Sequence, residues 1–104
     1  MNVLIIACSL NPVSRSAVLA AALAERLSGD AVSVEVVDLR DVTLPLCDGG
    51  SAYAAPEVGE MSRKISEADA VILAVPIYNY DVNAAAKNLI ELTGKAWIGK
   101  VVGF

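Results

Sequence analysis

Apolar residues along the chain gather into four short runs separated by polar segments. The run Val71–Val75 shows no alternation of apolar and polar positions, and it is ended by Pro76, which cannot donate the next ladder hydrogen bond. A strand of this kind is buried on both faces, as in the centre of a parallel sheet covered by helices. The other runs predict strands over Asn2–Cys8, Val32–Leu39 and Lys100–Phe104.

Between these strands, apolar residues recur at helical spacing. A first amphipathic helix is expected from Ala17, with Gly29 at its C′ position and an apolar face formed by Leu19, Leu23 and Leu27 with Ala20 and Ala24 beside them. A second is expected from Pro56 or Glu57, with an inner face of Val58, Met61, Ile65 and Ala68. A third is expected from about Asn83 to Gly94, with an inner face of Ala86, Leu89, Ile90 and Thr93.

Four strands alternating with three helices predict a single α/β domain over residues 1–104. We expect a doubly wound parallel sheet with strand order 2-1-3-4, because crossovers are right-handed and leave few other topologies. The connection from Arg40 to Pro56 is predicted to be a rim loop of the length found in functional lids or disordered segments. Ligands of such sheets bind where the loops after the first and third strands meet.

Composition narrows the classes of function. The net charge is −4 and no segment concentrates Lys or Arg, which argues against a nucleic-acid partner. The uncharged runs are too short to span a bilayer, which argues against a membrane protein. The absence of His excludes a Cys/His zinc site and a His-activated nucleophile, and two cysteines do not make a disulfide framework. We therefore expect a cytoplasmic protein with reduced thiols and no metal.

The loop after the first predicted strand is rich in hydrogen-bond donors. It leads into a helix N-terminus, where unpaired backbone N–H groups and the macrodipole favour an anion, and its donors are Ser9, Asn11, Ser14 and Ser16. These residues predict a phosphate site. The alternative is helix capping by Ser14 or Ser16, which explains only one of them. Neither a dinucleotide fingerprint nor a Walker loop is present.

The loop after the third predicted strand carries the aromatic and amide side chains Ile77, Tyr78, Asn79 and Tyr80. Such a loop suits a flat heteroaromatic ligand, because its rings and Ile77 can cover the faces of the ligand while backbone N–H groups meet its carbonyls. The alternative is a packed loop with buried tyrosines, and the residues alone favour that alternative.

The two loops together resemble those of the NAD(P)H-dependent FMN reductase family, the flavodoxin-like quinone, azo and chromate reductases. The resemblance covers the whole chain and rests on Ser9–Ser16 and on Pro76-Ile77-Tyr78-Asn79-Tyr80 followed by Lys87-Asn88, which matches P-x-Y-N-x(7,8)-K-N. It implies a flavodoxin-like fold and FMN whose phosphate contacts Ser9, Ser14, Arg15 and Ser16. It further implies that the flavin ring lies on Pro76–Tyr80, and that Lys87 and Asn88 brace that loop.

Some positions depart from the family pattern. Cys8 stands where Gly is usual and Asn11 where Arg is common, while Asp81, Asn83 and Ala84 replace small Ser, Pro or Gly residues. Asp81 has two interpretations: a carboxylate near the flavin that lowers its potential, or a cap for the helix that follows, which the sequence favours. We assign no catalytic role to either cysteine.

The resemblance implies an oxidoreductase in which hydride passes from NADPH or NADH to FMN and electrons then leave to a flavin, a quinone or a similar small molecule. No side chain is predicted to be catalytic, because the flavin supplies the chemistry. The main alternative is a flavodoxin-like electron-transfer or flavin-binding module without turnover, and a third is an inactive fragment. The last predicted strand begins at Lys100, so the fold is expected to be truncated relative to the family or completed by a homodimer or higher oligomer.

Overall fold

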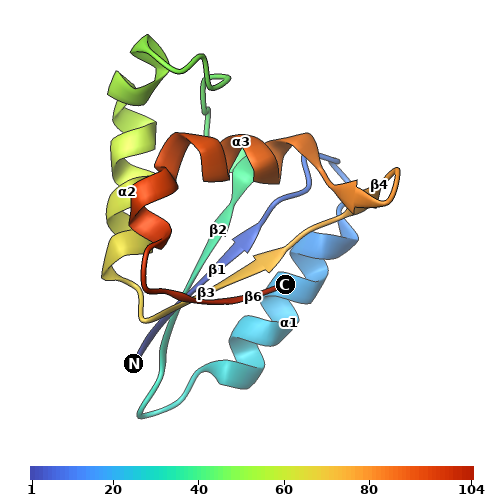
Figure 1. Ribbon diagram of the computed structural model, residues 1–104. Helices are drawn as coiled ribbons and strands as arrows, with labels where there is room; N and C mark the ends of the chain where they lie inside the picture. Colours follow the sequence, from blue (N-terminus) through green and yellow to red (C-terminus); the bar gives the residue numbers. More distant parts are fainter.

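The computed structural model describes all 104 residues and contains a four-stranded parallel sheet (Figure 1). Its strands are β1 (Asn2–Ala7), β2 (Ser33–Asp38), β3 (Ala70–Ala74) and β6 (Val101–Gly103). They lie in the order β2-β1-β3-β6. The predicted doubly wound sheet and its 2-1-3-4 order are therefore confirmed.

β1 lies at the centre of the sheet and fixes where the two candidate loops emerge. Ile5 pairs with Val36 of β2 on one side and with Ile72 of β3 on the other, both in parallel register. At the carboxyl ends, Ala7 lies opposite Ala74, and the Cys8 N–H donates to the Ala74 carbonyl at 2.9 Å. The segments after β1 and β3 thus leave the sheet side by side.

Helices cover both faces of the sheet. α2 (Pro56–Glu67) and α3 (Ala84–Thr93) lie on one face, and α1 (Arg15–Leu27) lies on the other (Figure 1). The larger core, between the sheet and α2 with α3, includes Leu4, Ile6, Met61, Ile65, Leu73 and Leu89. The core under α1 includes Val3, Ile5, Ala7, Ala20 and Ala74.

The inner face of α1 differs from the prediction at Leu19. Leu19 is 61% exposed, whereas Ala20 is completely buried against the sheet. Leu23 and Leu27 do pack against the core, together with Ala17 and Ala24. Small side chains let the helix axis approach the strands, so the stripe turned inward is centred on the alanines rather than on the leucines.

The ends of the helices agree in part with the sequence. α2 begins at Pro56 and α3 ends at Thr93, as expected. α1 ends at Leu27, and Ser28 is its C-cap with an extended backbone, although its N–H and hydroxyl both still donate to the Ala24 carbonyl. Gly29 therefore stands at the predicted C′ position, but its φ is not positive, so the helix does not end in a left-handed glycine.

The rim loop is ordered by local hydrogen bonds. It contains the short 3-10 helices η1 (Leu39–Asp41) and η2 (Ser51–Ala54). The Asp48 carboxylate accepts hydrogen bonds from the Gly50 and Ala52 N–H groups and from the Ser51 hydroxyl. These bonds favour the charged form and hold the pKa of Asp48 below its usual value.

β6 forms one edge of the sheet and pairs only with β3. Val101 is 72% exposed and Phe104 85% exposed, so this edge presents apolar side chains to solvent. The strand follows η3 (Gly94–Trp97), and the Lys100 ammonium donates to the Ser66 and Ala68 carbonyls at the end of α2. No helix has the length and apolar character needed to cross a bilayer.

Candidate functional site

The segment between β1 and α1 is a chain of small turns, which we call the phosphate loop (Ser9–Ser16). The Ser9 hydroxyl accepts from the Asn11 N–H at 3.2 Å, and the Asn11 side chain accepts from the Val13 N–H at 2.9 Å. Ser14 is the N-cap of α1, since its hydroxyl accepts from the Ala17 N–H at 3.0 Å. The capping interpretation of Ser14 is therefore confirmed, and the side-chain donors of Ser9, Asn11 and Ser16 have no acceptor in the chain.

The start of α1 offers unpaired donors and an unpaired cation. The Ser14 N–H has no acceptor in the chain, and the N–H groups of Arg15 and Ser16 stand at the first two helical positions, which have no intrahelical partner. The Arg15 guanidinium forms no ion pair, and the first turn contains no acidic residue. Such a helix start can bind a phosphate group.

Arg40 braces the phosphate loop from the neighbouring strand. Its guanidinium donates to the Asn11 and Pro12 carbonyls at 3.4 and 3.1 Å, and it forms an ion pair with Asp38 at 2.5 Å. The hydrogen bond from Arg40 holds the pKa of Asp38 below its usual value. We did not predict this residue from the sequence; an Arg just past the carboxyl end of the strand beside β1 was the available signal.

The second candidate loop is a β-hairpin, which we call the ring hairpin (Pro76–Val82). β4 (Ile77–Tyr78) pairs in antiparallel register with β5 (Asp81–Val82). Asn79 and Tyr80 join them with φ values of 51° and 68°, as a two-residue type I′ turn requires. Tyr80 is fully exposed and Tyr78 about half exposed, so the alternative of buried tyrosines is wrong.

One pocket lies between the phosphate loop and the ring hairpin. It has a volume of about 230 Å³ and is lined by Ser9, Asn11, Val13, Ser14, Arg15, Ser16, Pro76 and Tyr78. Seven of the ten residues predicted to bind the cofactor thus surround a single cavity. Ile77, Asn79 and Tyr80 do not line it and stand exposed at the end of the hairpin.

Comparison with known proteins places the chain in a family. A family model described as NADPH-dependent FMN reductase matches residues 1–104. The chain belongs to this reductase family. The family predicted from the two loops is thereby confirmed.

The chain spans about half the length of the curated relatives that it matches. It is 29% identical over 87 residues to the NAD(P)H-dependent FMN reductase of Saccharomyces cerevisiae, covering 73% of this chain and 46% of that protein. It is 30% identical over 105 residues to the FMN-dependent NADH:quinone oxidoreductase of Shewanella frigidimarina, covering 86% and 52%.

Two solved structures have the same fold. The flavoenzyme NAD(P)H:(acceptor) oxidoreductase FerB from Paracoccus denitrificans superimposes with a TM-score of 0.76 at 24% identity. The NADH:FMN oxidoreductase EMOB in its apo form gives 0.79, also at 24% identity. Both cover 97% of this chain, which covers 57% and 55% of theirs.

The Lys-Asn pair that completes the reductase motif has a different role from the expected one. The Asn88 side chain accepts from the Cys47 N–H at 2.8 Å and donates to the Pro45 carbonyl at 2.9 Å, so it holds the rim loop rather than the ring hairpin. Lys87 is exposed and pairs with Glu91 at 3.3 Å. The predicted bracing of the ring hairpin by these two residues is therefore wrong.

The expected cap on α3 is also wrong. Asp81 lies in β5, and its carboxylate accepts from the Val82 N–H at 2.7 Å. The N-cap residue of α3 is Asn83, whose side-chain amide donates instead to the Cys8 carbonyl at 2.7 Å. The N-cap position that we expected for Asp81 is therefore held by Asn83, two residues further along the chain.

The two cysteines of the chain are free thiols. Cys8 is completely buried, and burial raises the pKa of its thiol to about 12. Cys47 is half-buried in the rim loop, where its thiol donates to the Tyr53 hydroxyl at 3.6 Å. No three metal-ligating side chains lie together in the chain.

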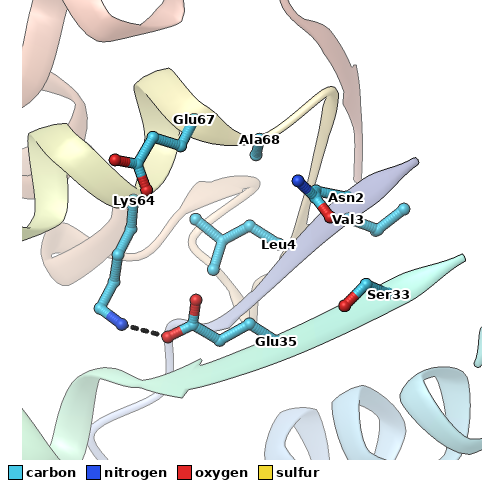
Figure 2. Close-up of a pocket in the computed structure, with 8 residues that line it drawn as sticks. All are labelled: Asn2, Val3, Leu4, Ser33, Glu35, Lys64, Glu67 and Ala68. Carbon is cyan, nitrogen blue, oxygen red and sulfur yellow. Dashed lines mark hydrogen bonds and ion pairs between the residues drawn. The ribbon is translucent and has the colours of Figure 1, made fainter.

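A second pocket lies at the opposite end of the strands (Figure 2). It has a volume of about 120 Å³ and is lined by residues of β1, β2 and α2, among them Asn2, Leu4, Glu35 and Lys64. The Lys64 ammonium points to the Glu35 carboxylate and also lies 3.8 Å from Glu60, so its charge is neutralised. This pocket offers no free charge and lies away from the carboxyl ends where cofactors of this fold bind.

Proposed function

We propose that this chain is the FMN-binding part of an NAD(P)H-dependent oxidoreductase that delivers electrons to a flavin, a quinone or a similar small acceptor. The observation that supports the proposal is the single pocket lined by both the phosphate loop and Pro76 with Tyr78 of the ring hairpin. The names of the relatives from Saccharomyces cerevisiae and Shewanella frigidimarina point to the same cofactor and donor. A cytoplasmic location and a homodimer or higher oligomer belong to the same proposal.

The residues fit FMN because the two ends of the pocket differ in chemistry. Arg15, the N–H groups of Ser14 and Ser16, and the Ser9 hydroxyl would hold the phosphate. Pro76, Ile77, Tyr78, Asn79 and Tyr80 would hold the ring edge, with the exposed tyrosine rings beside it. Bound there, FMN supplies hydride acceptance from NAD(P)H and onward electron transfer.

The first test separates FMN from riboflavin, which lacks the phosphate. Arg15→Gln is expected to weaken FMN binding about tenfold at low salt, because it removes one charge next to the proposed phosphate position, and to leave riboflavin binding unchanged. Flavin fluorescence during a titration reports both affinities. Arg26→Gln is the matched control, because Arg26 lies in the last turn of the same helix and also forms no ion pair.

The second test separates a reductase from a carrier. Chain loaded with FMN is expected to oxidise NADPH or NADH steadily when a quinone or free FMN is added. Tight flavin binding without reduction by either nucleotide would favour the flavin-binding module. An absence of flavin binding by the folded chain would overturn the proposal.

A further inference from the structure

Asn83 joins the two loops of the proposed site. It follows β5 directly and is 5% exposed. Its side-chain amide donates to the Cys8 carbonyl, at the end of β1, across 75 positions of sequence. Cys8 immediately precedes the phosphate loop, and Asn83 immediately follows the ring hairpin.

The hydrogen bonds of Asn83 are unusual for its position. An Asn at the N-cap of a helix ordinarily accepts a hydrogen bond from an N–H group of the first turn. Asn83 forms no such bond, and its carbonyl oxygen Oδ1 is buried without any partner. Buried side-chain oxygens in this condition are rare and costly, so the side chain is held by its bond to Cys8 at the expense of the capping bond.

No other hydrogen bond connects the two segments beyond the sheet. The bond from the Cys8 N–H to the Ala74 carbonyl continues the β1–β3 ladder, and past it the only bond between residues 8–14 and residues 75–83 is the one from Asn83. Beyond the ladder, this side chain therefore makes the only hydrogen bond that can hold the phosphate loop and the ring hairpin at a set distance.

We infer that Asn83 is a positioning residue that fixes the spacing of the phosphate loop and the ring hairpin, and so couples binding at the two ends of one flavin nucleotide. This inference rests on the proposed function. Two subsites held at the correct spacing give a linked ligand a high effective concentration at the second subsite, and a loose spacing lowers it. The benefit that the phosphate adds to flavin binding should thus depend on Asn83.

The measured quantity is the ratio of the dissociation constants of riboflavin and FMN. Asn83→Ala and the isosteric Asn83→Asp both remove the donor to Cys8, and each is expected to lower this ratio about fivefold or more. Asn88→Ala is the matched control. It removes a side-chain amide of α3 that is also hydrogen-bonded, but whose bonds hold the rim loop and not the phosphate loop. It should lower the melting temperature and leave the ratio unchanged, as any merely structural loss would.

A measurement on the unmodified chain does not depend on the folding of a variant. If the two subsites are held at the spacing of one flavin nucleotide, the unmodified chain should bind FMN about tenfold or more tightly than riboflavin, because the linked phosphate gains a high effective concentration at the second subsite. This difference together with a lowered ratio in the folded Asn83 variants supports the role. Equal affinities for the two flavins in the unmodified chain, or a folded variant that keeps the ratio, overturn it while FMN binding stands. Failure of the unmodified chain to bind either flavin overturns the proposed function as well.

Discussion

The buried thiol of Cys8 allows a quantitative test of the start of the phosphate loop. A thiol reacts as its thiolate, and the pKa of Cys8 is raised from 9.0 to about 12. At pH 8 the thiolate fraction is therefore roughly one in ten thousand, against about one in ten for the ordinary pKa, which is a factor of about a thousand. Complete burial of the side chain slows attack further.

The assay counts thiols with a chromogenic disulfide reagent at pH 8. In the native chain, one thiol is expected to react readily, that of the half-buried Cys47, and the second only as fast as the structure opens. Both should react at once in denaturant. Cys47→Ser should abolish the readily reacting thiol. Two readily reacting thiols in the native chain would refute the burial of Cys8.

The same shift predicts how the free energy of unfolding depends on pH. The folded chain binds the Cys8 proton more tightly than the unfolded chain, so this stabilisation is fully present below pH 9. It is lost as pH rises from 9 towards 12, by up to about 1.4 kcal/mol per pH unit. Chemical denaturation of Cys8→Ala should lack this part of the slope. An unchanged slope in that variant would contradict the assignment to Cys8.

Two further predictions concern the brace and the core. Arg40→Ala should weaken FMN binding about three- to tenfold, because the Asn11 and Pro12 carbonyls lose their donor and the phosphate loop loses its brace. Arg63→Ala removes ion pairs on the exposed side of α2 and should leave the FMN affinity unchanged when both variants are titrated by flavin fluorescence. Leu89→Ala should lower the free energy of unfolding in urea by about 3 kcal/mol, because Leu89 is completely buried, whereas the exposed Leu46→Ala should cost less than about 0.5 kcal/mol. Equal effects in either pair would contradict the packing described above.

The elements that the sequence predicted correctly are those specified by local chemistry. Pro76 ends β3 through its missing donor, and Pro56 begins α2 through its fixed φ. Ser14 caps α1 with a neighbouring N–H group. The uninterrupted apolar run Val71–Val75 correctly predicted an inner strand of the sheet, because a strand buried on both faces has no position for a polar side chain.

The elements that the sequence missed depend on partners distant in the chain. The exposure of Leu19 follows from how closely Ala20 lets α1 approach the sheet, which spacing within the helix does not encode. The bonds of Arg40, Asn83 and Asn88 reach across 28 to 75 positions, and no local pattern selects their acceptors. The ring hairpin was also missed, because Asn79-Tyr80 lacks the glycine that usually marks a type I′ turn.

The central place of β1 has a consequence for the order in which the molecule assembles. Val3 pairs with Val34, 31 positions later, and with Ala70, 67 positions later. Closing the longer loop costs roughly 0.7 kcal/mol more chain entropy, so the unit of β1, α1 and β2 is favoured to form before β3 joins it. The phosphate loop belongs to this early unit, whereas the ring hairpin belongs to the late one. A ligand that contacts both the phosphate loop and the ring hairpin can bind only after β3 has joined the sheet. Such a ligand would stabilise the folded chain by slowing the step of unfolding in which β3 separates from β1.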